Sequence, residues 1–170
     1  MASLIRVLVV DDFEPFRRFV CSTLGKRLDL HIVGEAIDGL EALHRGEELQ
    51  PDLILLDIGL PTLNGIEAAR RIRKHCPKCR ILFVSHESSA DIVQEAFRSG
   101  ASGYVVKTYA GSELLAAVDA ILEGRQFVSS GVTSHDSSSL KILPASSLSL
   151  SNSVSEAENC VKPQSKQTRT

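Results

Sequence analysis

The sequence has no tryptophan, only one methionine, and no large excess of charge of either sign. Its 170 residues carry a formal net charge of −2, so no bulk positive charge favours binding to nucleic acid. No apolar run approaches the roughly 20 residues that a membrane-spanning helix needs. The apolar start lacks the basic region and cleavage site of a signal peptide and leads directly into Asp11 and Asp12. We therefore expect a cytoplasmic chain with no membrane segment.

The four cysteines show no spacing typical of a disulfide framework. Cys76 and Cys79 form one CxxC pair, and no second pair is available to complete a zinc site. The pair follows a predicted helix, whereas a thioredoxin-like pair begins one. We interpret both residues as reduced loop cysteines, as expected in the cytosol.

Short apolar runs alternate with segments of helical spacing over most of the chain. The expected strands are Ile5–Val10, Leu30–Glu35, Asp52–Leu56, Arg80–Ser85 and Ser102–Val106. The expected helices are Glu14–Lys26, Asp38–Leu49, Asn64–His75, Ala90–Ser99 and Ser112–Leu122. Strands that alternate with helices form a parallel sheet covered on both faces, and right-handed crossovers leave few topologies. We predict an α/β fold, a flavodoxin-like (βα)5 doubly wound parallel sheet with strand order 2-1-3-4-5.

The composition changes after about residue 130. Residues 131–170 contain 11 serines, few large apolar residues and no sustained period. Such a segment buries too little apolar surface to offset the entropy lost on ordering. We therefore expect a folded domain over residues 1–127 and a Ser-rich disordered tail over 128–170. A short docking patch at Leu140, Ile142 and Leu143 is the alternative for part of this tail.

Three carboxylates follow neighbouring strands of the predicted sheet. Asp11 and Asp12 come after the first strand and Asp57 after the third. In this fold, ligands bind beyond the carboxyl ends of the strands, where the strand order reverses. Carboxylates brought together repel one another unless a cation lies among them, and hard oxygen ligands suit Mg²⁺. We expect a Mg²⁺ site here, although Asp12 alone is also compatible with a helix cap.

Two further polar residues follow the remaining strands, Ser85 after the fourth and Lys107 after the fifth. With the metal, they would complete a phosphoryl site in which Lys107 neutralises the anion and Ser85 donates a hydrogen bond to it. A carboxylate nucleophile forms an acyl phosphate in a recognised class of reactions. Asp57 ends the central strand and is the best placed nucleophile, which leaves the Asp11–Asp12 pair to hold the metal.

The motifs VLVVDD, PDLILLDIGLPTLNGIEAARRIR and GASGYVVK resemble the receiver domains of two-component response regulators, over roughly residues 4–125. The resemblance implies that Asp57 is the phosphorylated residue and that Asp11 and Asp12 help to bind Mg²⁺. It adds the backbone carbonyl of Gly59 as a metal ligand. It also implies a sensor histidine kinase or a phosphotransfer protein as the phosphoryl donor.

The same resemblance implies a conformational switch. Ser85 corresponds to the switch Ser/Thr and Lys107 to the phosphate-contacting lysine. Tyr104 stands at the aromatic switch position, whose ring changes rotamer with phosphorylation in this family. A half-buried strand aromatic is the alternative for Tyr104. A homodimer through the fourth helix, fifth strand and fifth helix is a further expectation.

The sequence departs from the usual receiver pattern at two positions. Thr108 stands where many receivers have proline, and His86 follows the switch serine where a small residue is usual. FVSHES and LLAAVDAILEGRQFVSS resemble the NarL/FixJ subgroup, whose members usually continue into a helix-turn-helix domain. Because no such helical pattern or basic recognition helix follows residue 130, we expect no direct nucleic-acid binding. A stand-alone receiver and a truncated or frameshifted DNA-binding regulator both fit this sequence.

Three function classes follow from these residues. The first is a phosphorelay switch that catalyses only its own phosphorylation and dephosphorylation and signals through protein contacts. The second is a Mg²⁺-dependent phosphatase with an aspartyl-phosphate. It needs a further acid/base carboxylate, for which we find no candidate beyond the Asp11–Asp12 pair. The third is a degenerate scaffold, against which the presence of all five site residues argues.

Overall fold

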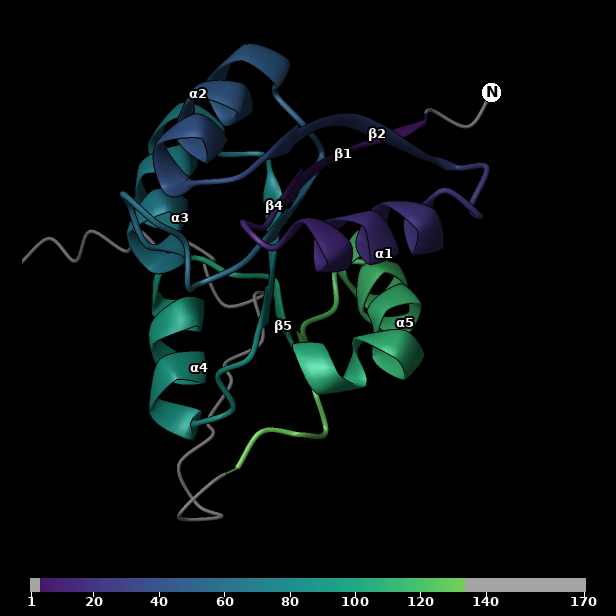
Figure 1. Ribbon diagram of the computed structural model, residues 1–170, viewed down its shortest axis with the longest axis vertical. Coiled ribbons are helices and arrows are strands. Elements are labelled where there is room, and N and C mark those ends of the chain that lie inside the picture. Colours follow the sequence, from purple (N-terminus) through teal and green to yellow (C-terminus); the bar gives the residue numbers. More distant parts are fainter. Residues whose placement is uncertain (1–3, 134–170) are drawn as a thin grey trace, which may run out of the picture.

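The fold is a parallel sheet with helices on both faces, as Figure 1 shows. A computed structural model describes residues 4–133 of the chain. The strands are β1 (Ile5–Val10), β2 (Leu30–Ala36), β3 (Leu53–Leu56), β4 (Arg80–Ser85), β5 (Gly103–Val106) and β6 (Phe127–Val128). The helices are α1 (Glu14–Leu24), α2 (Gly39–Leu49), α3 (Gly65–His75), α4 (Ala90–Arg98) and α5 (Ala110–Leu122), and a 3₁₀ turn, η1 (Lys107–Tyr109), precedes α5.

The strand order β2-β1-β3-β4-β5-β6 confirms the predicted flavodoxin-like topology for the first five strands. All ladders in this sheet are parallel. Because β6 has only two residues, it lacks the apolar run by which a strand is recognised in a sequence. The sixth strand was therefore not predicted.

Two apolar layers lie on opposite faces of the sheet. Successive side chains of a strand point to opposite faces. In β3, Ile54 and Leu56 pack in the layer beneath α2, α3 and α4, whereas Leu53 and Leu55 pack in the layer beneath α1 and α5. The central strands are apolar at nearly every position because both of their faces are buried. This double burial fixes the sheet and holds the carboxyl ends of the strands at one edge.

The turn after β3 brings the backbone very close to that edge at Gly65. The Gly65 N–H donates to the Ile58 carbonyl at 2.9 Å. A Cβ atom at Gly65 would lie 1.9 Å from the Asp57 carbonyl oxygen, so any side chain there must push the end of β3 and the start of α3 apart.

Replacing Gly65 by alanine should therefore destabilise the protein by about 1–3 kcal/mol, the usual cost of overpacking a tight contact. Urea unfolding monitored by circular dichroism measures this change. Gly111→Ala is the matched control, because a Cβ at Gly111 meets no atom within 4 Å. Equal unfolding free energies for the two variants would contradict the expectation.

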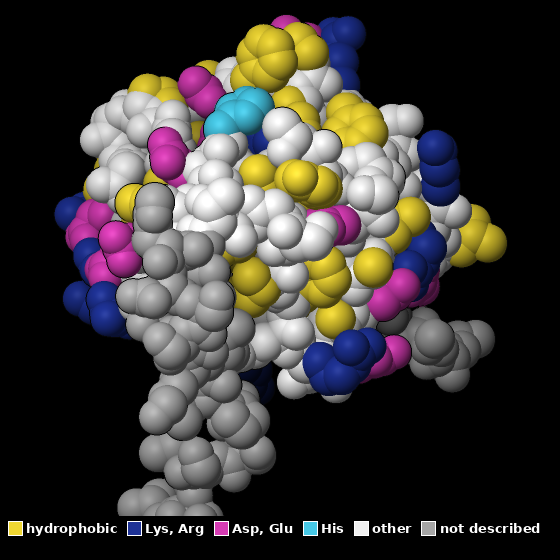
Figure 2. All heavy atoms as spheres, turned by 90° about the horizontal axis from the view of Figure 1, so that it is seen from below, with side chains coloured by type: hydrophobic (Ala, Val, Ile, Leu, Met, Phe, Trp, Pro, Cys, Tyr) yellow, Lys and Arg dark blue, Asp and Glu magenta, His cyan; other side chains and the backbone are white. Residues whose placement is uncertain are grey.

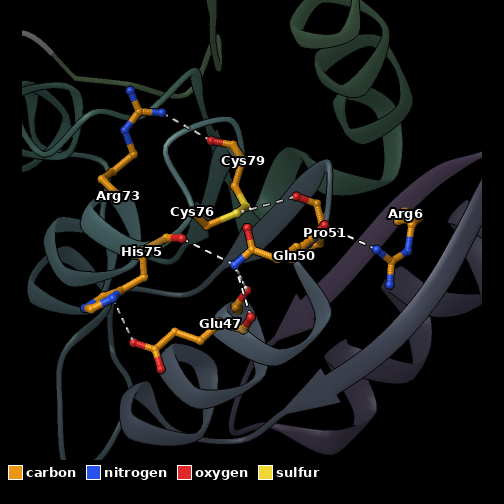
Figure 3. Close-up of a disulfide and its surroundings, with 9 residues drawn as sticks. Arg6, Glu47, Gln50, Pro51, Arg73, His75, Cys76 and Cys79 are labelled. Atoms are coloured by element: carbon orange, nitrogen blue, oxygen red, sulfur yellow. Dashed lines mark hydrogen bonds and ion pairs between the residues drawn. A yellow bond between two sulfur atoms is a disulfide. The ribbon is translucent and has the colours of Figure 1, made fainter.

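Cys76 and Cys79 are joined by a disulfide, with their Cα atoms 5.5 Å apart (Figure 3). The interpretation of two reduced loop cysteines was wrong. The Cys76 N–H ends α3 by donating to Ile72 at 2.7 Å, and the Cys79 N–H donates back to the Cys76 carbonyl at 3.1 Å. This tight turn brings two buried cysteines to a Cα separation typical of disulfides. A local turn thus makes the pairing without any wider disulfide framework.

The ordered chain continues past residue 127, where the sequence analysis placed the domain boundary. Residues 128–133 pack against the sheet because Val128 and Val132 join the apolar layer beneath α4. Their assignment to a disordered tail was wrong. The rest of the predicted tail, with its alternative docking patch, lies outside the described residues. Among residues 4–133, no helix combines the length and apolar character needed to cross a bilayer.

Candidate functional site

Asp11, Asp12 and Asp57 meet at the edge where the strands end. β1 and β3 are paired through Val10 and Leu56, so the residues that follow these two emerge side by side. One carboxylate oxygen from each aspartate lies within 4.8 Å of the others. Asp11 and Asp57 are buried, whereas Asp12 is exposed. The predicted convergence of the three carboxylates is present in the fold.

Lys107 points into this cluster from the end of β5. Its Nζ lies 2.6 Å from Asp11 Oδ2 and 2.8 Å from Asp57 Oδ2, and its side chain is 3% exposed. Burial opposes the charge on Lys107, but the hydrogen bonds with Asp11 and Asp57 outweigh it and raise the pKa of the amine. Lys107 therefore stays cationic and holds two carboxylates by charge-assisted bonds.

Burial raises the pKa of Asp11 above its ordinary value, against the opposing effects of Lys107 and the Phe13 N–H. That N–H donates to Asp11 Oδ1 at 2.9 Å. The Arg17 guanidinium donates to the Asp11 carbonyl at 2.9 Å and to the Glu35 carboxylate at 2.7 Å. These two bonds fix the start of α1 against β2. The acidic pair is thus held by its own loop and by α1.

The donor set suits a divalent cation with hard-oxygen preference. Three carboxylates face one small region, with the Lys107 ammonium among them. Gly59 lies two residues after Asp57, and its N–H donates to Asp57 Oδ1 at 3.3 Å. Carboxylates with room for water on one side match the preference of Mg²⁺, which retains several waters and often a phosphate oxygen. The acidic cluster can therefore hold a metal ion.

A pocket of about 280 Å³ opens beside the cluster. It is lined by Asp12, Phe13, Asp57, Ile58, Gly59, Ser85, His86, Glu87 and Lys107. Figure 2 shows this end of the molecule, where a histidine lies at the surface beside acidic and apolar side chains. The pocket gives a small anionic group access to Asp57, with the exposed His86 at its wall.

Ser85 ends β4 and is buried at the pocket wall. Its hydroxyl oxygen accepts the Glu87 N–H at 3.4 Å. Since Ser85, Lys107 and Asp57 line the same pocket, the sequence-predicted phosphoryl contacts come from three different strands to one place.

Tyr104 is fully buried, so the alternative of a half-buried aromatic is wrong. Its ring lies 6.4 Å from that of Phe83, and its hydroxyl donates to the Glu87 carbonyl at 2.8 Å. Burial raises the pKa of Tyr104 to about 12, although a hydrogen bond with Ser85 acts in the opposite direction. The ring therefore occupies the interior, and its hydroxyl is bound to the loop that follows Ser85.

Phe16 is a site residue that the sequence reasoning missed. Its ring lies beneath the Lys107 ammonium, 4.7 Å from Nζ to the ring centroid. A cation above an aromatic face is stabilised by the ring quadrupole. Phe16 falls within the expected helix Glu14–Lys26, and no local pattern links it to a lysine 91 positions away in the chain.

Thr108 replaces the proline of many receivers without an unusual backbone. Every peptide bond within residues 4–133 is trans, including Lys107–Thr108. Lys107 and Thr108 belong to η1, which leads directly into α5. The lysine is therefore positioned by a 3₁₀ turn.

Residues 7–119 match the family model described as the response regulator receiver domain. The DNA-binding transcriptional activator DevR/DosR of Mycobacterium tuberculosis is 38% identical over 125 residues, 74% of this chain and 58% of that protein. The signal receiver domain of the putative response regulator NarL from the same organism superposes with a TM-score of 0.68 at 33% identity, covering 72% of this chain and 99% of that one.

A two-component response regulator of the LuxR family from Aurantimonas sp. SI85-9A1 superposes with a TM-score of 0.73 at 36% identity, covering 76% of this chain and 93% of that one. The chain spans a little over half of the length of the first curated relatives that it matches. The matched residues 7–119 contain Asp11, Asp12, Asp57, Ser85 and Lys107.

Proposed function

The chain belongs to the response regulator receiver domain family of two-component systems, and from that premise we propose that it is a phosphorylation switch with Asp57 as the phosphoryl acceptor. The observation that carries the proposal is that Asp57 lies next to both the Lys107 ammonium and the Asp11–Asp12 pair, at the wall of an open pocket.

The proposed reaction is transfer of a phosphoryl group to a carboxylate oxygen of Asp57. The donor is a phosphohistidine of a sensor histidine kinase or a phosphotransfer protein. A carboxylate oxygen bonds to phosphorus, the phosphorus–nitrogen bond breaks, and the departing imidazole keeps the electron pair. Lys107 neutralises the phosphoryl oxygens, and the Ser85 hydroxyl donates a hydrogen bond to one of them. The reaction serves the switch itself, with no independent turnover of substrates.

Mg²⁺ is the proposed cofactor. Asp11, Asp12, Asp57 and the Gly59 carbonyl would hold it, and when bound it would supply charge neutralisation for the incoming phosphoryl group. Phe16 and Arg17 hold Lys107 and Asp11 in place, so the protein side of the site is preorganised before the phosphoryl group arrives.

The proposed output is a population shift between two forms of the domain. Phosphate on Asp57 draws Ser85 toward it, which favours the buried position of the Tyr104 ring. The surface formed by α4, β5 and α5 then changes its preference for partners, including a second copy of the chain. We propose that this signalling takes place in the cytoplasm, through protein contacts.

Incubation with acetyl phosphate as a small phosphodonor tests the function. With Mg²⁺, intact-mass analysis should find one acid-stable, base-labile phosphoryl group on the protein. With a chelator in place of Mg²⁺, the loading rate should fall by a factor on the order of 100, because a metal ion contributes several kcal/mol at a developing phosphoryl charge. Equal loading with and without the metal would refute the proposed role of the acidic cluster.

A further inference from the structure

Residues 127–133 run along the outer edge of β5, and we call this segment the strap. Its first two residues form β6, which pairs parallel with β5 so that Val128 lies beside Tyr104. The Ser129 N–H then donates to the Tyr104 carbonyl at 2.8 Å. The strap is therefore hydrogen-bonded to the backbone of the switch tyrosine itself.

The far end of the strap is bound to the loop between β4 and α4. The Thr133 N–H donates to the Ser88 carbonyl at 2.8 Å, and the Ala90 N–H donates to the Thr133 carbonyl at 3.2 Å. Ser88 directly follows Glu87, whose carbonyl accepts the Tyr104 hydroxyl. The strap and the tyrosine side chain thus hold neighbouring residues of the same loop.

The middle of the strap is bound to α5 and η1. The Glu113 carboxylate accepts the hydroxyls of Ser129 and Ser130, and also the Ser130 N–H at 3.2 Å. Gly131 lies against the Tyr109 ring so closely that a Cβ would be 2.2 Å from a ring carbon. The strap is therefore bound to residues of α4, β5 and α5, and we call the residues that hold it the seat of the strap.

This seat closes the side of the Tyr104 ring that faces the sheet edge. Phe83 and Val128 flank Tyr104 on the two adjacent strands, and all three pack in the same apolar layer. Because side chains at paired positions of adjacent strands point to the same face, Val128 stands between the ring and the open edge. The ring cannot move outward at this edge while the strap is seated.

We propose that the strap is a regulatory element that holds Tyr104 in its buried position and is coupled to the phosphoryl group on Asp57. The inference rests on the proposed function, in which phosphate favours the same buried position. Two ligands or contacts that favour one state strengthen each other by the same factor. A seated strap therefore tightens the phosphoryl site, and an occupied phosphoryl site tightens the strap. A homodimer through α4, β5 and α5 would then meet the strap as part of its surface.

Beryllofluoride with Mg²⁺, a mimic of the phosphoryl group, is the probe for this coupling. Hydrogen–deuterium exchange should show that it slows exchange in the strap, where the Ser129 and Thr133 amides are hydrogen-bonded. Gly131→Ala should unseat the strap, speed this exchange and weaken beryllofluoride binding on the order of fivefold or more, the usual range of coupling between sites. Gly111→Ala, in the first turn of α5 with open space around it, should behave as wild type.

Thr133→Pro gives a second variant, because it removes the N–H that binds Ser88 and leaves Gly131 unchanged. Faster exchange in the strap with unchanged beryllofluoride affinity in both variants would overturn the coupling while leaving the proposed function intact. If wild type bound no beryllofluoride and took up no phosphate, the proposed function would fail, and the coupling with it. If the strap amides of the wild-type protein exchanged without protection, the proposed contacts that hold the strap would be refuted, whatever the phosphoryl chemistry.

Discussion

Asp57→Asn is expected to abolish phosphate uptake completely while changing the unfolding free energy by no more than about 1 kcal/mol. An amide oxygen is a poor nucleophile, so no acyl phosphate can form at this position. The asparagine keeps the size of the side chain and one oxygen that can accept the Lys107 bond, now 2.8 Å long. Lys107 also keeps Asp11 as a charged partner. Intact-mass analysis after treatment with acetyl phosphate and Mg²⁺, with urea unfolding beside it, measures both effects.

Asp38→Asn is the matched control for this variant. Asp38 caps α2, where its carboxylate accepts the N–H groups of Leu40 and Glu41, and asparagine caps helices about as well as aspartate. The control should load phosphate as wild type does. Phosphate retained on the Asp57→Asn protein would instead place the acceptor on another residue, with Asp12 the first to examine because it lines the same pocket.

The sequence was sufficient to predict the sheet and the acidic edge because both follow from local patterns. Buried parallel strands read as apolar runs, and the ranges Ile5–Val10 and Arg80–Ser85 match the observed strands β1 and β4 to the residue. Once the strand order is known, the residues after each strand end must share one edge. The meeting of Asp11 with Asp57 needs no further information.

The features that were missed depend on contacts between distant parts of the chain. The strap has little pattern of its own, and its order comes from a seat made by Ser88, Glu113 and Tyr109. Phe19 lies on the same apolar side of α1 as Val20 and Leu24, yet its side chain is 38% exposed whereas theirs are buried. Periodicity shows which side of a helix is apolar, whereas the depth of each residue depends on what packs against it.

The Cys76–Cys79 disulfide was missed for a different reason. The prediction of reduced cysteines relied on the expected cytosolic location and on the lack of a spacing typical of disulfide frameworks. Both arguments concern the chain as a whole. The pairing depends on the turn that ends α3, in which the Cys79 N–H bonds the Cys76 carbonyl. Turn geometry at a helix end is decided by a few backbone bonds that composition does not reveal.

Lys107→Met is expected to destabilise the metal-free protein by about 3–5 kcal/mol at neutral pH, the usual effect of removing one partner from a buried ion pair. Methionine is similar in length, and its thioether packs well on an aromatic ring such as Phe16. The loss therefore comes from charge, because Asp11 and Asp57 remain in a site whose lysine side chain is only 3% exposed. Lys26→Met, at an exposed position of the sequence before β2, should change stability by no more than about 0.5 kcal/mol.

The same prediction fixes how the difference in unfolding free energy between Lys107→Met and wild type changes with pH. Burial already raises the pKa of Asp11 in the folded protein above its ordinary 3.8, and loss of the lysine must raise it further. A carboxyl whose folded pKa is raised costs stability above that pKa, and the cost vanishes as the pH falls to the unfolded value. The unfolding free energies of Lys107→Met and wild type should therefore converge as the pH approaches 3.8 and separate toward neutrality.

Mg²⁺ should restore part of the lost stability in Lys107→Met, because it places a new cation among the three carboxylates. Urea unfolding in chelator and in Mg²⁺, at neutral and acidic pH, separates this electrostatic account from a packing defect. A packing defect would persist at every pH and in both media. If Lys107→Met unfolded like wild type in chelator at neutral pH, the lysine would not be the counter-ion of the acceptor site, and its proposed contact with the phosphoryl group would lose its basis.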